Sequence, residues 1–198
     1  MMSSIAVLPR FLGALFYYPP TSPDVLAIVG SLPALPALCP WAERAEMETL
    51  CQLWPEPEAE AFIWQYSVLF EGQGEMFAPP WASVYLEKEN LLMGESTVRY
   101  RAFLRQHGLS FTGAQQEPED QFGLMLLALA ALLEQEKDQA AQTLLEAYLL
   151  PWSDRYLERV QQNPYSPFYA QLAAVTRLLL QGMQRHYGLQ PETPRMFF

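Results

Sequence analysis

The sequence predicts an all-α protein, a single globular domain of many short helices around one central apolar helix. Hydrophobic residues make up 51% of the 198 residues and charged residues 17%, a balance that favours a buried core over disorder. The windows 81–117, 119–150 and 168–190 contain no proline and are rich in Leu, Ala, Gln and Glu, which favours helices. No convincing run of alternating β-branched residues indicates a strand.

Prolines separate four helices predicted in the first half of the chain. They cover about residues 8–18, 23–31, 41–53 and 57–70. Pro9 and Pro23 stand at the first turns of the first two helices, where a missing N–H costs little. Ser22 is placed to cap the second helix. An irregular stretch, 71–94, follows.

Five more helices are predicted in the second half, at about 96–107, 118–135, 139–149, 152–162 and 168–187. Gly108 closes the first of them. The second is apolar nearly all round from Leu124 to Leu133, so we expect it to be the central, buried helix. Asp138 is placed to cap the third.

Prolines also predict where the helical pattern ends in the last third of the chain. Pro151 is expected to interrupt the chain between the helices at 139–149 and 152–162. Residues 1–187 are expected to form the domain, and residues 188–198, which include Pro191 and Pro194, a flexible C-terminal tail.

Composition excludes several classes of function. The net charge of −10 disfavours nucleic acid as a partner and favours a cationic ligand. The cysteines, Cys39 and Cys51, and the histidines, His107 and His186, are too few for a zinc site or a disulfide framework. No P-loop and no nucleophile–base pair is present. We therefore expect no cofactor, no metal and no catalysis.

The N-terminal apolar segment after Arg10 predicts a buried first helix rather than a signal peptide, because no small-x-small cleavage site follows promptly. The longest apolar run, Leu124 to Leu133, falls short of the ~20 residues that a membrane-spanning helix needs. Two free thiols are typical of a reducing, cytoplasmic setting.

Acidic and aromatic residues gather in one part of the chain. Residues 43–75 hold glutamates at positions 43, 46, 48, 56, 58, 60, 71 and 75, with Arg44 as the one basic residue. Among them, Tyr66, Leu69 and Phe70 share a helical face. That face either packs into the core or forms the floor of a groove with an acidic rim.

Two further stretches each allow a structural and a binding interpretation. In 76–81, two prolines stiffen a loop that ends in Trp81, which either pins the loop to the core or grips a peptide. At the start of the central helix, Glu117, Glu119 and Asp120 either complement the helix dipole or offer a carboxylate to an arginine, which pairs with it bidentately. A peptide with arginines followed by a short apolar segment would suit all three features.

Several motifs, in this order and spacing, resemble the DmsD/TorD family of redox-enzyme maturation chaperones over residues 10 to 185. The opening run at 12–18 is similar to the DmsD branch in particular. The other motifs are Leu69-Phe70, the A-P-P-W-A-S-V-Y-L run at 78–86, G-E-S-T at 94–97, E-P-x-D at 117–120, Leu150-Pro151-Trp152 and Phe168-Tyr169.

The resemblance implies an all-helical, cytoplasmic chaperone that binds the twin-arginine leader of a molybdopterin oxidoreductase subunit and holds it until its molybdenum cofactor is inserted. It allows the Tat translocase as a second partner, and a monomer or a dimer that exchanges helices. An alternative is a chaperone that grips the body of its client enzyme with little role for the leader. The leader-binding positions that the resemblance implies fall on Tyr66, Leu69, Phe70, Pro80, Trp81, Glu117, Asp120 and Gln121.

One position departs from the family pattern. Gln121 stands where the family usually has histidine after the aspartate. Glutamine keeps the capacity to donate and accept hydrogen bonds, but it does not titrate near neutral pH. No role for a protonated imidazole is therefore carried over to this chain.

Overall fold

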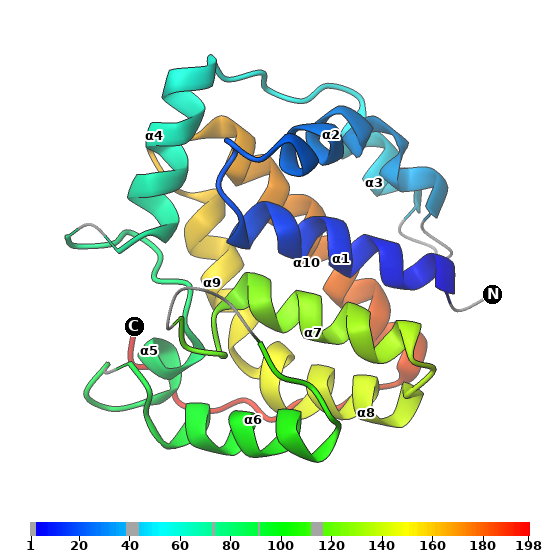
Figure 1. Ribbon diagram of the computed structural model, residues 1–198, viewed down its shortest axis with the longest axis vertical. Coiled ribbons are helices and arrows are strands. Elements are labelled where there is room, and N and C mark those ends of the chain that lie inside the picture. The colour runs from blue at the N-terminus through cyan, green and yellow to red at the C-terminus, as the bar shows by residue number, and fades with distance from the viewer. Residues whose placement is uncertain (1–2, 39–43, 73, 91, 112–116) are drawn as a thin grey trace.

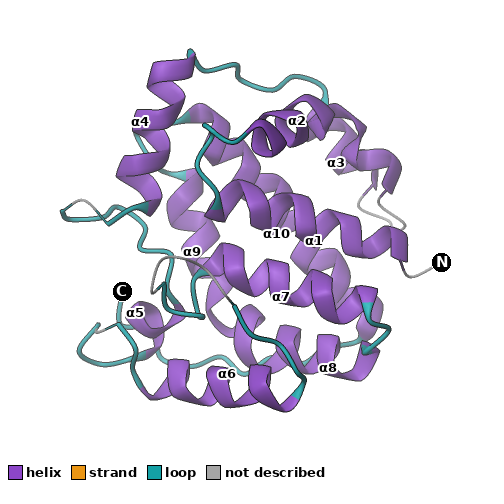
Figure 2. Cartoon of the chain, in the orientation of Figure 1, coloured by secondary structure: helices purple, strands orange, loops and turns teal. Residues whose placement is uncertain are grey.

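A computed structural model describes residues 3–38, 44–72, 74–90, 92–111 and 117–198, and within these ranges it contains helices and no β-strand (Figures 1 and 2). The predicted all-α fold is confirmed. None of the helices in these ranges is both long enough and apolar enough to cross a membrane. Cys39 and the start of the helix predicted at 41–53 lie outside the described residues.

The elements follow one another along the chain in two halves. The first half contains α1 (Ser3–Tyr17), α2 (Pro23–Ser31), the 3₁₀ helix η1 (Leu32–Leu38), α3 (Arg44–Cys51), α4 (Ala59–Phe70) and the short α5 (Ala82–Leu86). The second half contains α6 (Glu95–Gln106), α7 (Phe122–Glu134), α8 (Asp138–Thr143), the π-helical η2 (Leu144–Leu149), α9 (Leu150–Gln161) and α10 (Pro167–Tyr187).

Helix α1 differs from the prediction at its start. It begins at Ser3, so Pro9 lies inside the helix and not in its first turn. A proline inside a helix costs about 3 kcal/mol. Ala6, Leu8 and Leu12 are fully buried on both sides of it, and burying a leucine side chain contributes roughly 1.5–3 kcal/mol. Core packing around the proline therefore outweighs the missing hydrogen bond.

The break predicted at Pro151 is wrong. The chain is helical from α8 through η2 to the end of α9. A π turn inserts one extra residue into a helix, and here it ends directly before α9, where Pro151 occupies a first-turn position that needs no N–H donor. Asp138 is the first residue of α8, and Lys137, not Asp138, stands at the capping position.

Helix α7 is the central helix, as predicted, and ten of its thirteen residues are buried. It lies against α1, and the two helices run side by side in Figure 1. Gly13 of α1 faces Gly123 of α7 so closely that a Cβ atom on Gly13 would come within 2.8 Å of the Gly123 carbonyl oxygen. Glycine at both positions allows this contact. This close approach of α1 to α7 also brings the rings of Phe16 and Phe122 to a centroid distance of 5.0 Å.

The C-terminal segment packs against the domain, where the sequence predicted a flexible tail. Gly188 ends α10 in the left-handed conformation, and Leu189 is buried. Farther along, the Phe197 N–H donates to the Tyr85 carbonyl at 3.0 Å. The prolines at 191 and 194 disfavour a helix, but Phe197 and Phe198 are apolar and find partners in α5 and α9.

Candidate functional site

Two loops that are far apart in the sequence meet beside the start of α7. The Ala82 N–H donates to the Asp120 carbonyl at 3.1 Å, and the Phe122 N–H donates to the Pro80 carbonyl at 2.7 Å. These bonds form an isolated antiparallel bridge between Trp81 and Gln121. The bridge satisfies the backbone groups of both loops. It therefore joins the proline–tryptophan loop to the acidic stretch at 117–121.

Trp81 and Glu117 are in direct contact at this junction. The Trp81 indole Nε1 donates a 2.5 Å hydrogen bond to Glu117 Oε1. Trp81 is only 8% exposed, which agrees with the interpretation that it pins its loop, and its contact with a peptide stays a prediction. Burial raises the pKa of the Glu117 carboxyl, while the hydrogen bond from Trp81 acts in the opposite direction.

Glu119 is already paired inside the protein. The Arg101 guanidinium donates two hydrogen bonds of 2.7 Å to its two carboxylate oxygens. This pairing lowers the pKa of the Glu119 carboxyl. A bidentate arginine–carboxylate pair leaves little capacity for a second guanidinium.

Asp120 is buried, with 1% of its surface exposed. Its Oδ2 accepts hydrogen bonds from the Ser83 N–H at 2.8 Å and from the Thr97 hydroxyl at 3.0 Å. Burial raises the pKa of the Asp120 carboxyl, and the bonds from Ser83 and Thr97 oppose the shift. The carboxylate thus connects the start of α5 to the first turn of α6, and it does not face solvent.

The predicted start of the central helix is wrong by about four residues. Helix α7 begins at Phe122, so Glu119 and Asp120 precede it and do not lie in its first turn. Gln121 is the capping residue: its Oε1 accepts from the Leu124 N–H at 2.9 Å. Its Nε2 donates to the Phe16 carbonyl at 3.1 Å. Both ends of the Gln121 amide are therefore used within the protein, and the residue ties α7 to the end of α1.

The aromatic face of α4 packs into the core. Tyr66, Leu69 and Phe70 are each at most 6% exposed, and the Phe70 ring contacts those of Phe16 and Tyr169 at 5.7 and 4.9 Å. This burial agrees with the core-packing interpretation of the face, and a role of these side chains in leader binding stays a prediction.

The α4 face still adjoins the acidic stretch. The Tyr66 hydroxyl donates to the carbonyl oxygen of Tyr17. The pKa values of Tyr66 and Tyr17 are raised first by burial, and the charge of Glu117 adds to both shifts. Tyr17, Tyr66 and Glu117 are therefore close enough to interact electrostatically.

Four residues of this site were not singled out from the sequence as site residues: Tyr17, Ser83, Thr97 and Arg101. Three of them lie inside motifs that carried the family resemblance, namely the opening run, the proline–tryptophan run and G-E-S-T. Those motifs could have pointed to Tyr17, Ser83 and Thr97. No motif pointed to Arg101, because its partner Glu119 lies 18 residues away in the sequence.

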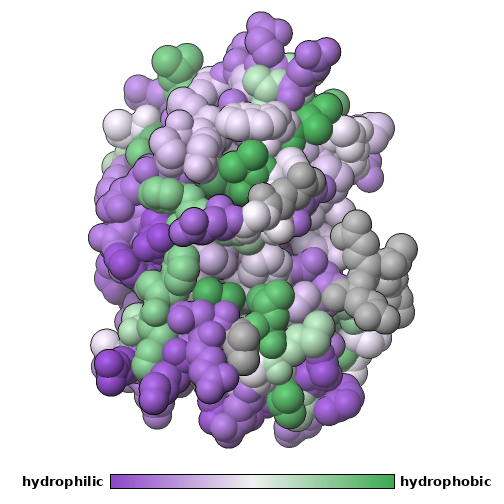
Figure 3. Space-filling model, turned by 90° about the vertical axis from the view of Figure 1, so that its left-hand side faces the viewer, coloured by the Kyte–Doolittle hydropathy of each residue, from purple (hydrophilic) through white to green (hydrophobic). Residues whose placement is uncertain are grey.

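On the face that carries α4, separate hydrophobic patches lie among hydrophilic residues (Figure 3). On α4 itself, Ile63 and Trp64 are 43% and 54% exposed. Glu71 and Glu75, in the loop after α4, are exposed as well. This face therefore combines apolar and negatively charged surface.

No group of three or more His, Cys, Asp or Glu side chains could hold a metal ion within the described ranges. Cys51 is buried, and burial raises the pKa of its thiol to about 11. A thiol with such a pKa is protonated at neutral pH and is a poor nucleophile.

Comparison with known proteins identifies the family. Residues 39–158 match the family model described as nitrate reductase delta subunit. The chain is 36% identical to a Tat proofreading chaperone DmsD from Salmonella typhimurium over 88% of this chain and 86% of that protein. It is 32% identical to a Haemophilus influenzae relative that carries the same DmsD name, over 99% and 98% of the two chains.

One more distant relative agrees with this assignment, and a solved structure shares the fold. The Escherichia coli chaperone protein YcdY is 28% identical over 92% of this chain and 95% of its own length. A solved structure of a redox enzyme maturation protein from Archaeoglobus fulgidus shares the fold, with a TM-score of 0.55, 20% identity and coverage of 91% and 94% of the two chains. The curated relatives are named chaperones, which supports the prediction that the chain is not an enzyme. The chain belongs to the DmsD/TorD family of redox-enzyme maturation chaperones.

Proposed function

We propose that this chaperone binds the twin-arginine leader of a molybdenum-cofactor oxidoreductase subunit of the DMSO-reductase type. It holds the precursor in the cytoplasm, as a monomer, until the cofactor is inserted, and the Tat translocase then receives the released client. The names of the Salmonella and Haemophilus relatives, which are Tat proofreading chaperones, support a Tat substrate as the client.

The observation that carries this proposal is the state of the three carboxylates at 117–120. Glu119 is taken by Arg101, and Asp120 is buried. Glu117 is half-buried, with one oxygen bound to the Trp81 indole, and no lysine or arginine among the described residues forms an ion pair with it. A guanidinium pairs with a carboxylate and also stacks on aromatic rings. Glu117 suits a leader arginine as the carboxylate partner, and the half-buried ring of Tyr17 nearby can stack on the guanidinium.

Titration of a synthetic twin-arginine leader into the protein tests the proposal. We expect replacement of both leader arginines by glutamine to weaken binding at least about tenfold, the equivalent of one charged hydrogen bond. Replacement of both arginines by lysine should weaken binding less than replacement by glutamine. Binding should still be weaker than with arginine, because lysine lacks the planar guanidinium that pairs bidentately with a carboxylate. Added salt should weaken binding without abolishing it. Equal affinity for the arginine and glutamine peptides would contradict leader recognition.

A second candidate function is a chaperone that grips the body of its client. The exposed pair Ile63 and Trp64 on the outer face of α4 favours it, since Trp64 is backed by the half-buried ring of Tyr165 at 5.9 Å. A pull-down with leader-deleted client separates the two functions. Full retention of the leader-deleted client would favour the second, and loss of retention favours the first.

A further inference from the structure

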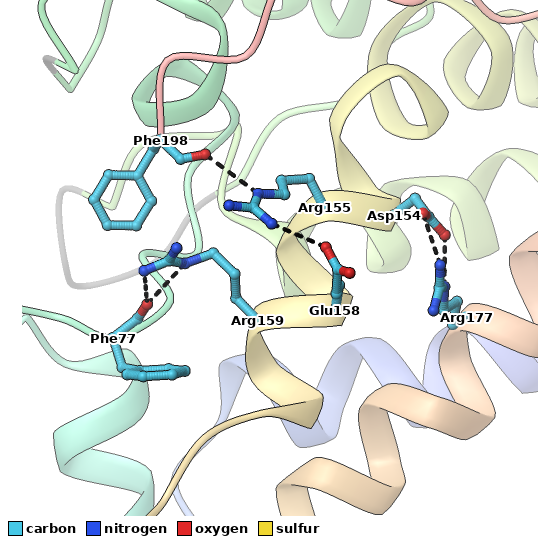
Figure 4. Close-up of polar contacts among 7 residues, drawn as sticks. All are labelled: Phe77, Asp154, Arg155, Glu158, Arg159, Arg177 and Phe198. Atoms are coloured by element: carbon cyan, nitrogen blue, oxygen red, sulfur yellow. Dashed lines mark hydrogen bonds and ion pairs between the residues drawn. The ribbon is translucent and has the colours of Figure 1, made fainter.

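The end of the chain lies on the protein as a bound peptide would. The Phe197 N–H donates to the main-chain carbonyl of Tyr85 at 3.0 Å. The Phe198 ring meets the Tyr85 ring edge-on at 5.6 Å, and the Arg159 guanidinium lies 4.4 Å from the Phe198 centroid. Arg155 Nε lies 3.5 Å from the Phe198 carbonyl oxygen (Figure 4). Main-chain hydrogen bonds combined with side-chain contacts are how proteins hold extended peptides.

We call the surface under these residues the tail seat. It consists of Tyr85, Arg155 and Arg159. Both arginines project from α9, which Asp154 ties to α10 through two hydrogen bonds of 2.6 and 2.9 Å from Arg177 (Figure 4). The two helices of the seat are in contact as well, since the Tyr85 ring of α5 lies 5.3 and 6.2 Å from those of Trp152 and Tyr156 of α9, and a peptide-binding surface requires such support.

The tail seat is continuous with the candidate site. Arg159 Nε and Nη2 donate to the Phe77 carbonyl at 3.0 and 2.8 Å, and the guanidinium lies 5.5 Å from the Phe77 ring centroid (Figure 4). Phe77 belongs to the loop that leads to Pro80 and Trp81. One guanidinium therefore holds both the tail and the loop of the candidate site.

The candidate site needs a surface for the apolar part of a leader beside Glu117. Tyr66, Leu69 and Phe70, which were expected to provide it, are in the core. The tail, by contrast, has the order of chemistry that the site was predicted to bind, a cation followed by apolar side chains: Arg195, Met196, Phe197 and Phe198. The surface that holds this segment is therefore suited to a second segment of the same kind.

We propose that the tail seat is a peptide-binding surface that residues 195–198 fill in the free protein. The apolar stretch of the client leader displaces them while its arginines meet Glu117. This inference rests on the proposed function. Because the tail is tethered through the short segment 189–194, it competes at a high effective concentration. A client must therefore contact Glu117 as well as the seat to replace it.

Two substitutions test the inference, one in the tail (Phe198) and one in the tail seat (Arg159). Phe198→Ala weakens the tail and leaves the seat intact, so it should tighten leader binding by about tenfold if the tail is docked about nine-tenths of the time. Arg159→Gln damages the seat itself and should weaken leader binding. Leu26→Ala, an exposed side chain on α2, is the control and should change nothing. Denaturant unfolding establishes that each variant is folded.

The directions in which Phe198→Ala and Arg159→Gln change the affinity for the leader decide whether the inference holds. If Arg159 and Phe198 only brace the 76–81 loop, both substitutions weaken leader binding, and the inference is overturned while the proposed function stands. No change with Phe198→Ala overturns it equally. If the wild-type protein does not bind the leader at all, the proposed function fails, and the role of the client in displacing the tail fails with it.

A measurement without leader examines the seat alone. A labelled peptide of residues 191–198 should bind Phe198→Ala more tightly than the wild type, because the tethered tail of the wild type occupies the same surface. Absence of binding to Phe198→Ala would show that the seat does not hold peptides, whatever the leader does.

Discussion

The indole of Trp81 and the carboxylate of Glu117 share a 2.5 Å hydrogen bond although they lie 36 residues apart in the sequence. The bond fixes the orientation of a carboxylate that no cation among the described residues neutralises through an ion pair. It also places that carboxylate at the edge of an aromatic ring. The Glu117 oxygen that Trp81 does not bind can therefore pair with a guanidinium.

Glu117→Gln should weaken binding of a twin-arginine leader by about five- to tenfold, the range expected for loss of one charge-assisted hydrogen bond. Fluorescence polarisation with a labelled leader measures this. Glutamine keeps an acceptor oxygen for the Trp81 N–H, so the fold should be unaffected. Glu136→Gln, an exposed glutamate elsewhere, serves as the control for the general loss of one negative charge. If the two variants bind the leader equally well, Glu117 does not meet an arginine.

Leader binding should weaken as the pH falls through the raised pKa of Glu117, which lies above the ordinary value of 4.5. Protonation there removes the charge that attracts arginine. The contribution of Glu117 to stability changes with pH in the opposite direction. Because the native state holds the proton more tightly than the unfolded state, its contribution to the free energy of unfolding rises as the pH falls through that pKa. Affinity measured against pH should be flatter for Glu117→Gln than for the wild type.

Asp120→Ala should lower the free energy of unfolding by about 2–4 kcal/mol, because it leaves the Ser83 N–H and the Thr97 hydroxyl without an acceptor in the core. Asp120→Asn keeps one acceptor oxygen and removes a buried charge, so its loss should be smaller. Urea unfolding measures both. The Asn variant should still distinguish arginine from glutamine leaders. If it keeps wild-type stability and loses that discrimination, Asp120 itself contacts the leader.

Gly13→Ala should destabilise the protein by about 1–3 kcal/mol, since the new Cβ would lie 2.8 Å from the Gly123 carbonyl oxygen and 2.9 Å from Leu126 Cβ. Gly30→Ala is the matched control: it also lies in a helix, and its Cβ would meet nothing within 4 Å. That change should stabilise by about 0.5–1 kcal/mol through helix propensity. Thermal unfolding should shift in opposite directions, and a Gly13→Ala variant as stable as Gly30→Ala would contradict the close packing of α1 on α7.

Local signals in the sequence predicted most of the helices. Helices α4 and α10 begin within two residues of their predicted starts, at Ala59 and Pro167, because prolines and capping residues act on their immediate neighbours. The predictions failed at Pro9, at Pro151 and at the start of α7. At Pro9 and at the start of α7, packing or pairing with distant residues outweighed a local preference, and such contacts leave no periodic pattern in a single sequence. At Pro151 the π turn directly before α9 places the proline in a first-turn position.

The sequence by itself determined the helical class, the central apolar helix and the negative charge, since these depend on composition and on the spacing of apolar residues. It also indicated the two loops of the candidate site. Only the tertiary structure decided which carboxylate of 117–120 remains available, because availability depends on partners such as Ser83 and Arg101 that folding brings from elsewhere. It likewise decided that the last residues dock on α5 and α9, where aromatic rings and arginines from separate helices converge.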